Sequence, residues 1–202
     1  IKGNAEHHFV VDGAANFSIK LKDGWFVTET GEGHLTSRGA LLAMYGNVNY
    51  HGGTAELKYV DLINNWNNYI ASTDPLESGS GGAVHLITGA NSVINLTMTH
   101  CKIENCYAAN SGGAMFIKGV YRSTPSTVTM EDCETLNCFT ACTGGVGYGG
   151  TYRTEESSSG PNFDITMTRC SIHDNVSANW AGAICYNLPS APLKLNSCTI
   201  SD

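Results

Sequence analysis

Cysteine is the residue type whose number and spacing in this chain most directly suggest chemistry. The 202-residue sequence contains eight cysteines, with one pair in CKIENC (Cys101 and Cys106) and another in CETLNC (Cys133 and Cys138). Thiols bind metals or form disulfides, but the CxxC pairs of a zinc ribbon do not occur. The sequence therefore predicts no metal site, and it leaves disulfides and buried free thiols as alternatives.

Acidic side chains form a second candidate, because Glu131, Asp132 and Glu134 lie close together in the sequence. Polysaccharide lyases use clustered acidic calcium ligands together with a basic residue, here Arg169. Strand alternation, however, lets Asp132 and Glu134 point apart from Glu131. The alternative is a surface charge ladder along one row of side chains: His100, Asp132, Arg169 and Ser197. We therefore predict no catalytic residue and no cofactor.

Aromatic side chains in loops are a third candidate, because sugar-binding sites use exposed rings. Trp66, Tyr69 and Tyr152 fall in segments rich in turn formers, and Trp180 lies beside a turn. Isolated aromatic residues also serve as covers over packed cores. These four residues are therefore candidates for glycan binding, with packing as the alternative.

An exported protein is favoured by the glycosylation sequons together with the eight cysteines. The sequons are NFS at Asn16, NLT at Asn95 and NVS at Asn175. Net charge is −7 and no Lys/Arg cluster occurs, so the chain is not expected to bind nucleic acid. No apolar run approaches the roughly 20 residues of a membrane span. We expect a secreted or cell-surface location.

A repeat places these residues in register. The segment Val93–Ile117 aligns with Ser126–Gly149 and with Phe163–Asn187, and shorter copies occur at Thr54–Asn65 and at the C-terminus. Residues at equivalent positions of the copies have similar side chains. Four such columns are Leu62, Ile103, Thr135, Ile172 and Ile200; Val60, Cys101, Cys133, Cys170 and Cys198; Leu57, Met98, Met130, Met167 and Leu195; and Asn65, Cys106, Cys138 and Asn175.

Each copy predicts short strands joined at sharp bends. Apolar residues alternate, shift by one residue before the cysteine, and alternate again. A pair of small residues follows and precedes a third strand such as AMFIK. Glycine suits such stacked turns because they need positive φ or no Cβ; the predicted turn residues are Gly81, Gly82, Gly112, Gly113, Gly144, Gly145 and Gly182. The chain is therefore expected to be all-β, a right-handed parallel β-helix whose coils stack about 4.8 Å apart.

The cysteines fall into two columns of this stack. Cys101, Cys133, Cys170 and Cys198 share an inward column, where free thiols acting as small hydrophobes are favoured over strained disulfides between coils. Cys106 and Cys138 share a turn column and form the disulfide candidate.

The chain divides into two regions. Residues 1–53 are expected to form degenerate N-terminal coils or a cap, and residues 54–202 the regular repeats. Two insertions, Trp66–Ser80 and Gly150–Asn162, are expected to leave the stack as loops. The last copy stops before its Asn or Cys position, which predicts that further coils, or another chain, stack onto that end.

These motifs resemble those of polymorphic outer membrane proteins and related β-helix adhesins, which combine a GGA(I/V/L) turn with an upstream F-x-x-N. The turn stands here as GGAV (81–84), GGAM (112–115), GGVG (144–147) and AGAI (181–184). The second motif stands as LINN (62–65) and IHDN (172–175), and cysteine replaces asparagine in IENC and TLNC. Similar coils occur in pectin-lyase-like β-helices.

The resemblance, over roughly residues 55–202, implies a secreted or surface-displayed stalk with adhesion as its usual role. Its expected partners are neighbouring coils or subunits of the same assembly, and glycans or host or cell-surface proteins. The first functional hypothesis is a non-enzymatic structural or adhesive segment. The alternative is a carbohydrate-active β-helix enzyme, a lyase or a glycoside hydrolase.

Overall fold

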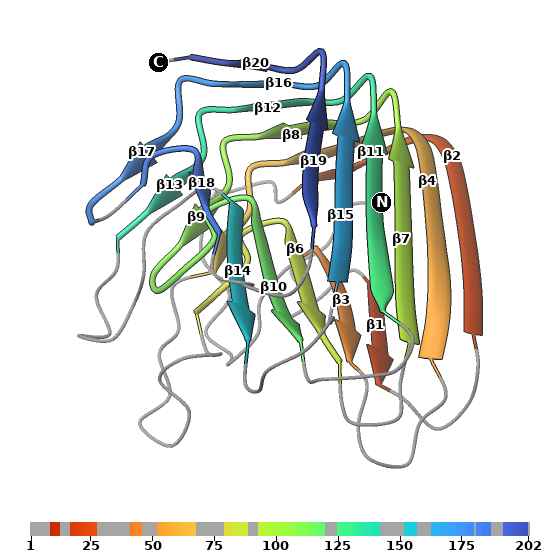
Figure 1. The fold of residues 1–202 in the computed structure, drawn as a ribbon. Helices are drawn as coiled ribbons and strands as arrows, with labels where there is room; N and C mark the ends of the chain where they lie inside the picture. Colours follow the sequence, from red (N-terminus) through yellow and green to blue (C-terminus); the bar gives the residue numbers. More distant parts are fainter. Residues whose placement is uncertain are drawn as a thin grey trace.

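The computed structural model describes residues 9–12, 17–27, 41–45, 52–67, 79–88, 93–119, 125–141, 152–156, 163–179, 181–186 and 192–201. These residues form three β-sheets and no helix, and every strand pairing is parallel. Figure 1 shows strands from successive repeats lying side by side in each sheet. The predicted all-β class with parallel strands is confirmed.

The largest sheet, called the long sheet, takes two strands from most repeats. Its ten strands are β2 (Phe17–Val27), β4 (Gly52–Ile63), β7 (Val93–Thr99), β8 (Lys102–Glu104), β11 (Ser126–Glu131), β12 (Glu134–Leu136), β15 (Phe163–Thr168), β16 (Ser171–His173), β19 (Leu193–Asn196) and β20 (Thr199–Ile200). Strand β4 pairs with β7 along its first part and with β8 along its second. The sheet therefore has two branches joined through one continuous strand.

Two further sheets complete the repeats. The six-stranded sheet contains β1 (Phe9–Asp12), β3 (Leu42–Tyr45), β6 (Val84–Ile87), β10 (Met115–Gly119), β14 (Tyr152–Glu156) and β18 (Ile184–Cys185). The four-stranded sheet contains β5 (Trp66–Asn67), β9 (Tyr107–Ala108), β13 (Phe139–Thr140) and β17 (Val176–Ser177). From β4 to β18, the chain visits the long, four-stranded and six-stranded sheets in the same order four times.

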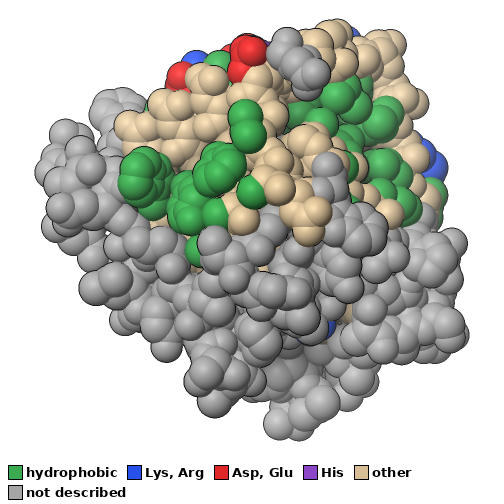
Figure 2. All heavy atoms as spheres, turned by 90° about the vertical axis from the view of Figure 1, so that its left-hand side faces the viewer, with side chains coloured by type: hydrophobic (Ala, Val, Ile, Leu, Met, Phe, Trp, Pro, Cys, Tyr) green, Lys and Arg blue, Asp and Glu red, His purple; other side chains and the backbone are tan. Residues whose placement is uncertain are grey.

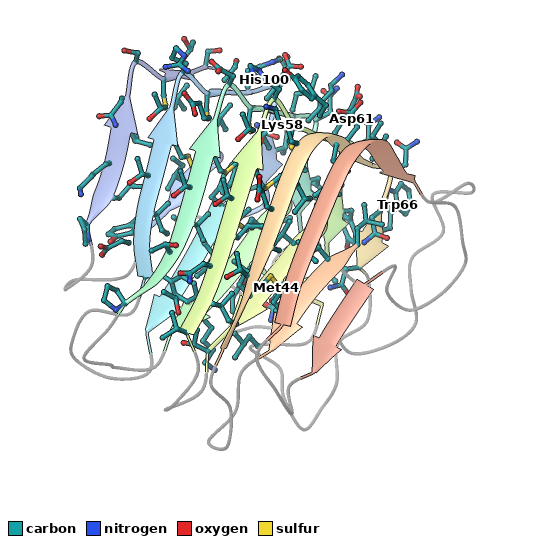
Figure 3. The ribbon with its side chains drawn as sticks, turned by 90° about the vertical axis from the view of Figure 1, so that its right-hand side faces the viewer. Met44, Lys58, Asp61, Trp66 and His100 are labelled. Atoms are coloured by element: carbon teal, nitrogen blue, oxygen red, sulfur yellow. The ribbon has the colours of Figure 1, made fainter. Side chains whose placement is uncertain are left out.

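The apolar columns of the alignment form the core. In the long sheet Met130 pairs with Met98 on one side and with Met167 on the other, and all three are buried. Leu57 continues this column in β4, and Met44 of β3 lies inside the stack (Figure 3). Each repeat therefore buries its apolar residues against those of its neighbours, as a stacked repeat requires.

The bends between the strands use residues with positive φ. Before the first cysteine column these are Tyr59, His100, Asp132, Arg169 and Ser197, with φ between 51° and 54°. Before the second column they are Asn64, Asn105, Asn137 and Asp174, with φ between 52° and 57°. Non-glycine residues adopt this conformation rarely, and Asn and Asp tolerate it best. The one-residue bend expected before the cysteine is therefore a left-handed residue repeated in every copy.

One loop assignment is wrong in part. The segment Gly150–Asn162 was expected to leave the stack, but residues 152–156 form β14, which pairs with β10 and β18. The extra residues of this copy therefore precede β14, which pairs with the equivalent strands of both neighbouring repeats. The other insertion begins inside strand β5, and its residues 68–78 lie outside the described part of the chain.

Residues before Thr54 also contribute to the sheets. Strand β2 pairs with β4 over most of its length, and β3 pairs with β1 and β6. Strand β1 lies in the same N-terminal region, and residues 1–8 before it lie outside the described part of the chain.

Candidate functional site

The structure presents three rows of side chains that run across the repeats. One is a polar row at the first bend, the second is a buried row of thiols, and the third is an aromatic row on the four-stranded sheet. Each row arises because equivalent residues of successive repeats pair in register. Each is considered below for the chemistry that it supports.

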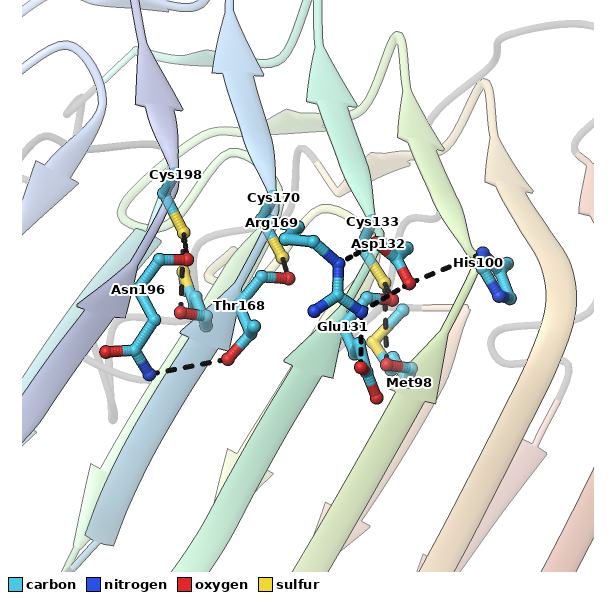
Figure 4. A network of polar contacts seen from close by, with 11 residues as sticks. Met98, His100, Glu131, Asp132, Cys133, Thr168, Arg169, Cys170, Asn196 and Cys198 are labelled. Carbon is cyan, nitrogen blue, oxygen red and sulfur yellow. Dashed lines mark hydrogen bonds and ion pairs between the residues drawn. The ribbon is translucent and has the colours of Figure 1, made fainter.

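The polar row lies on the outer side of the first bend. Arg169 donates to both oxygens of Asp132, from Nε to Oδ1 at 2.7 Å and from Nη2 to Oδ2 at 2.9 Å. Its Nη2 also donates to Oε1 of Glu131. The guanidinium holds the pKa of Asp132 below its usual value, chiefly through these hydrogen bonds. One arginine therefore ties together two of the three acids in the candidate cluster (Figure 4).

The same row continues towards the N-terminal repeats. Nδ1 of His100 lies 3.8 Å from Oδ2 of Asp132, and the His100 ring stacks on Tyr59 with centroids 4.9 Å apart. Nζ of Lys58 lies 5.5 Å from the centre of the Tyr59 ring. Figure 3 shows Lys58 and His100 at this bend. The row matches the surface charge ladder considered from the sequence.

The third acid of the cluster has a different partner. Oε1 of Glu134 lies 3.1 Å from Nε2 of His173, whose Nδ1 lies 2.7 Å from Oδ2 of Asp174. The two carboxylates raise the pKa of His173, Asp174 more than Glu134. The acids therefore divide between the Arg169 guanidinium and the His173 imidazole. Among the described residues no group of three or more His, Cys, Asp and Glu side chains is arranged to hold a metal ion.

The inward cysteine column is a ladder of free thiols. Sγ of Cys101 donates to the Leu57 carbonyl at 3.4 Å, Cys133 to Met98 at 3.5 Å, and Cys198 to Met167 at 3.4 Å. Each of these bonds joins a thiol to the preceding repeat. Hydrogen bonds with the thiols of Cys101 and Cys170, together with burial, raise the pKa of Cys133. The bond with Cys133 lowers the pKa of Cys101 and that of Cys170. The row joins successive repeats through weak polar contacts inside the core.

The expected bridge between Cys106 and Cys138 is not formed in the structure. Both are buried free thiols, and each sulfur donates to a backbone carbonyl two residues earlier in its own repeat, Glu104 or Leu136. Burial raises the pKa of Cys138, which disfavours the thiolate that disulfide chemistry requires. The turn column is therefore hydrogen-bonded to the backbone and carries no cross-link.

The aromatic row contains one residue that the sequence singled out and two that it did not. Trp66 of β5 pairs with Tyr107 of β9, which pairs with Phe139 of β13. Ring centroids are 5.9 Å apart for the first pair and 5.5 Å for the second. Trp66 is 49% exposed and Phe139 36%. The row ends at Val176, which is 56% exposed and pairs with Phe139.

The alignment contained a signal for this row. Trp66, Tyr107, Phe139 and Val176 each stand four residues after the register position that Leu62, Ile103, Thr135 and Ile172 share. Reading aromatic residues as isolated loop features missed this column. Figure 2, which views the side where β9, β13 and β17 lie, shows hydrophobic side chains gathered on this face.

The other aromatic candidates do not join this row. Tyr152 is 2% exposed and its hydroxyl lies 2.6 Å from Oγ1 of Thr135, so it packs inside the molecule. A glycan cannot reach a side chain that is buried in this way, and Tyr152 is removed from the binding candidates. Tyr69 and Trp180 lie outside the described residues.

The glycine pairs of the turns pack against the aromatic strands of the next repeat. Gly81 and Gly112 have φ of 74° and 68°, a conformation that favours glycine. A Cβ at Gly82 would lie 3.0 Å from the Tyr107 backbone, and one at Gly113 would lie 2.8 Å from the Phe139 carbonyl oxygen. The glycines are therefore required where they support the row. At Gly182 the nearest atom to such a Cβ is 3.6 Å away. Gly144 and Gly145 lie outside the described residues.

The sequons and one surface depression complete the candidate features. Asn95 is partly buried, and its Oδ1 accepts a hydrogen bond from Thr127 at 2.8 Å. Asn16 lies outside the described residues. A shallow depression of about 510 Å³ lies beside the end of the aromatic row and is lined by Asp174, Asn175, Val176, Ser177 and Gly182.

Comparison of the chain with protein-family models finds no matching family, and neither the curated proteins nor the solved structures give a match. No helix among the described residues is long and apolar enough to cross a membrane.

Proposed function

We propose that this chain is a right-handed parallel β-helix that acts as a non-enzymatic structural and adhesive segment of a secreted or cell-surface protein. The observation that carries the proposal is the in-register pairing of successive repeats in three sheets. Such stacking produces a rigid body from repeated short segments. It also repeats each outward side chain at a fixed interval along the stack.

The buried features support a structural role. The Met98, Met130 and Met167 column lies in the core with the thiols of Cys101, Cys133 and Cys170, and both sets connect neighbouring repeats. The turn glycines fit tightly against the next repeat. These contacts between neighbouring repeats stabilise the stack.

The polar row supports the non-enzymatic proposal over the enzyme alternative. A catalytic acid of a glycosidase or lyase needs a carboxyl group that is poised to transfer a proton or bind a cation. Arg169 holds the carboxylates of Glu131 and Asp132, and a lowered pKa keeps Asp132 ionised. The cluster is thus occupied by internal ion pairs.

An assay on acidic and neutral polysaccharides tests the proposal. The purified chain is incubated with polygalacturonate, alginate and soluble cellulose derivatives, with and without calcium, and the length of the polymers and their unsaturated ends are measured. We expect no shortening of any polymer. Depolymerisation that is abolished by Glu131→Gln or Arg169→Lys would support the enzyme alternative instead.

The expected location has its own test. Intact cells of the native source are labelled with a biotin reagent that does not cross membranes, and the chain is then recovered and identified by mass spectrometry. We expect the chain among the labelled surface proteins or in the culture medium. Recovery only from the interior of lysed cells would contradict the surface role.

A further inference from the structure

The aromatic row formed by Trp66, Tyr107 and Phe139 is a continuous apolar strip on the outside of the molecule. The Trp66 and Tyr107 ring centroids lie 5.9 Å apart with planes tilted by 52°, and the Tyr107 and Phe139 rings are stacked at 5.5 Å with planes 25° apart. The tilt at Trp66 leaves part of its aromatic surface open. Exposure of 49% at Trp66 and 36% at Phe139 agrees with this geometry.

The row is held in place by the backbone behind it. The turn glycines Gly82 and Gly113 pack directly against the strands that carry Tyr107 and Phe139, with no space for a Cβ. Backbone hydrogen bonds set the spacing between the strands that carry the rings. The Tyr107 N–H donates to the Asn65 carbonyl at 2.7 Å, and the Phe139 N–H donates to the Cys106 carbonyl at 2.9 Å. The rings are therefore preorganised, which lowers the entropy cost of binding.

Amide side chains accompany the rings along the row. Asn64, Asn105 and Asn137 each stand two residues before an aromatic rung, and Asn105 and Asn137 are exposed. Amides offer both donors and acceptors for hydrogen bonds. An aromatic surface bordered by amides suits a ligand that has an apolar face and a rim of hydroxyl groups.

Two other ligand classes that stack on aromatic rows fit less well. Single-stranded nucleic acid needs a positively charged groove along its backbone, whereas this chain carries a net charge of −7 and Asp174 stands beside the row. A stable protein interface covers about 800 Å² on each partner. The four-stranded sheet has strands of only two residues, so the row is one side chain wide.

We infer that the row Trp66–Tyr107–Phe139 binds a neutral, extended polysaccharide chain that runs across the repeats, parallel to the stack. The C–H groups on the face of a sugar ring carry a small positive charge and pack against the negative face of an aromatic ring. The asparagines then bond the sugar hydroxyls. This inference rests on the proposed function and gives it a ligand class and a site.

Titration with defined oligosaccharides tests the inference. The probes are cellohexaose and chitohexaose, which are neutral and extended, and hexagalacturonate, which is acidic. Binding is followed in the ¹H–¹⁵N spectrum of the 202-residue chain and by calorimetry. We expect one of the two neutral hexasaccharides, or both, to shift the Trp66 indole N–H signal, and we expect hexagalacturonate to bind more weakly.

Matched variants locate the site. Trp66→Leu and Phe139→Leu keep an apolar side chain but remove the ring, and each is expected to weaken binding of the neutral probe about tenfold. Tyr59→Leu removes a ring with similar exposure, 46%, at the other bend and is expected to leave binding unchanged. The thermal unfolding midpoint of each variant shows that it is folded. Val176→Trp adds a fourth ring to the row and is expected to tighten binding.

Several outcomes would overturn the inference. These are no binding of either neutral hexasaccharide at millimolar concentration, equal binding by the Trp66→Leu variant, tighter binding of hexagalacturonate, or self-association of the chain through the row. In each case the polysaccharide assay and the surface labelling still decide the proposed function. Cleavage of a polymer in that assay would overturn the proposed function even if the row binds sugar.

Discussion

Gly113 packs so closely under Phe139 that a side chain at position 113 would meet three backbone atoms of the neighbouring repeat. An added Cβ would lie 2.8 Å from the Phe139 carbonyl oxygen, 2.9 Å from its carbonyl carbon and 3.0 Å from its nitrogen. Backbone atoms in a paired strand cannot move away without breaking the sheet. This contact couples the turn of one repeat to the aromatic strand of the next.

Gly113→Val is expected to prevent or severely weaken folding. Because the clash is with the backbone of a paired strand, Phe139 in the next repeat, we expect a loss of about 3 kcal/mol or more in the free energy of unfolding, the upper range for overpacking. Urea denaturation followed by circular dichroism measures this loss. Gly182→Ala is the control, because its nearest neighbour, the Asn175 carbonyl oxygen, lies at an ordinary 3.6 Å. Wild-type stability of the Gly113→Val variant would refute the stacked arrangement.

Asn175 is expected to stabilise the stack by bridging two backbone groups of the preceding repeat. Its Oδ1 accepts from Cys138 N–H at 2.9 Å, and its Nδ2 donates to the Thr135 carbonyl at 3.1 Å. Asn175→Ala leaves both groups without these bonds, and we expect a loss of about 1–3 kcal/mol. Asn196→Ala, at an exposed edge with one long 3.4 Å contact to Thr168, should cost much less. Equal effects of the two changes would contradict the bridging role.

The pKa of His173 is expected to lie above the usual histidine value, because Asp174 and Glu134 stabilise the imidazolium. A raised folded-state pKa means that this contribution to stability is fully present below the unfolded pKa, about 6.5. It is lost as pH rises through the folded pKa. NMR titration of the imidazole should show the raised value and a decrease in Asp174→Asn. Asp164→Asn, on strand β15, is the control. An unchanged His173 titration in Asp174→Asn would exclude Asp174 as the main cause.

The buried cysteines are expected to be unreactive in the native protein and free after unfolding. Cys101, Cys106, Cys133, Cys138 and Cys170 are all buried free thiols. Iodoacetamide added to the native chain should leave them unmodified, whereas iodoacetamide added in guanidinium without reductant should alkylate all five. Peptide mass spectrometry distinguishes the two results. A Cys106–Cys138 cross-linked peptide in the unreduced sample would contradict the thiol assignment.

The register of the repeats was predictable from the sequence because apolar residues and cysteines recur in fixed columns. Met98, Met130 and Met167 were aligned by pattern, and they pair in the long sheet. The bend before the cysteine was also predictable, since the alternation shifts there by one residue. The left-handed conformation of His100 and Arg169 was not, because bulky residues adopt it against their intrinsic preference.

Strand β14, the polar row and the aromatic row could not be predicted in full, because they depend on contacts between residues far apart in the sequence. Strand β14 follows an insertion whose length hides the register of Tyr152, so its residues resembled a loop. The pairing of Arg169 with Asp132 joins side chains 37 residues apart. The aromatic row required the alignment to be extended one strand further, to Trp66, Tyr107 and Phe139. Side-chain identity there varies from repeat to repeat, which weakens the signal.

The most direct test of the stacked repeats is a nuclear Overhauser measurement on the chain labelled with ¹³C in its methionine methyl groups. The structure pairs Met98 with Met130 and Met130 with Met167, all buried in one column. We predict methyl–methyl cross-peaks between Met98 and Met130 and between Met130 and Met167, assigned by single Met→Leu variants. A folded protein that lacks both cross-peaks would contradict the in-register stack on which the proposed function depends.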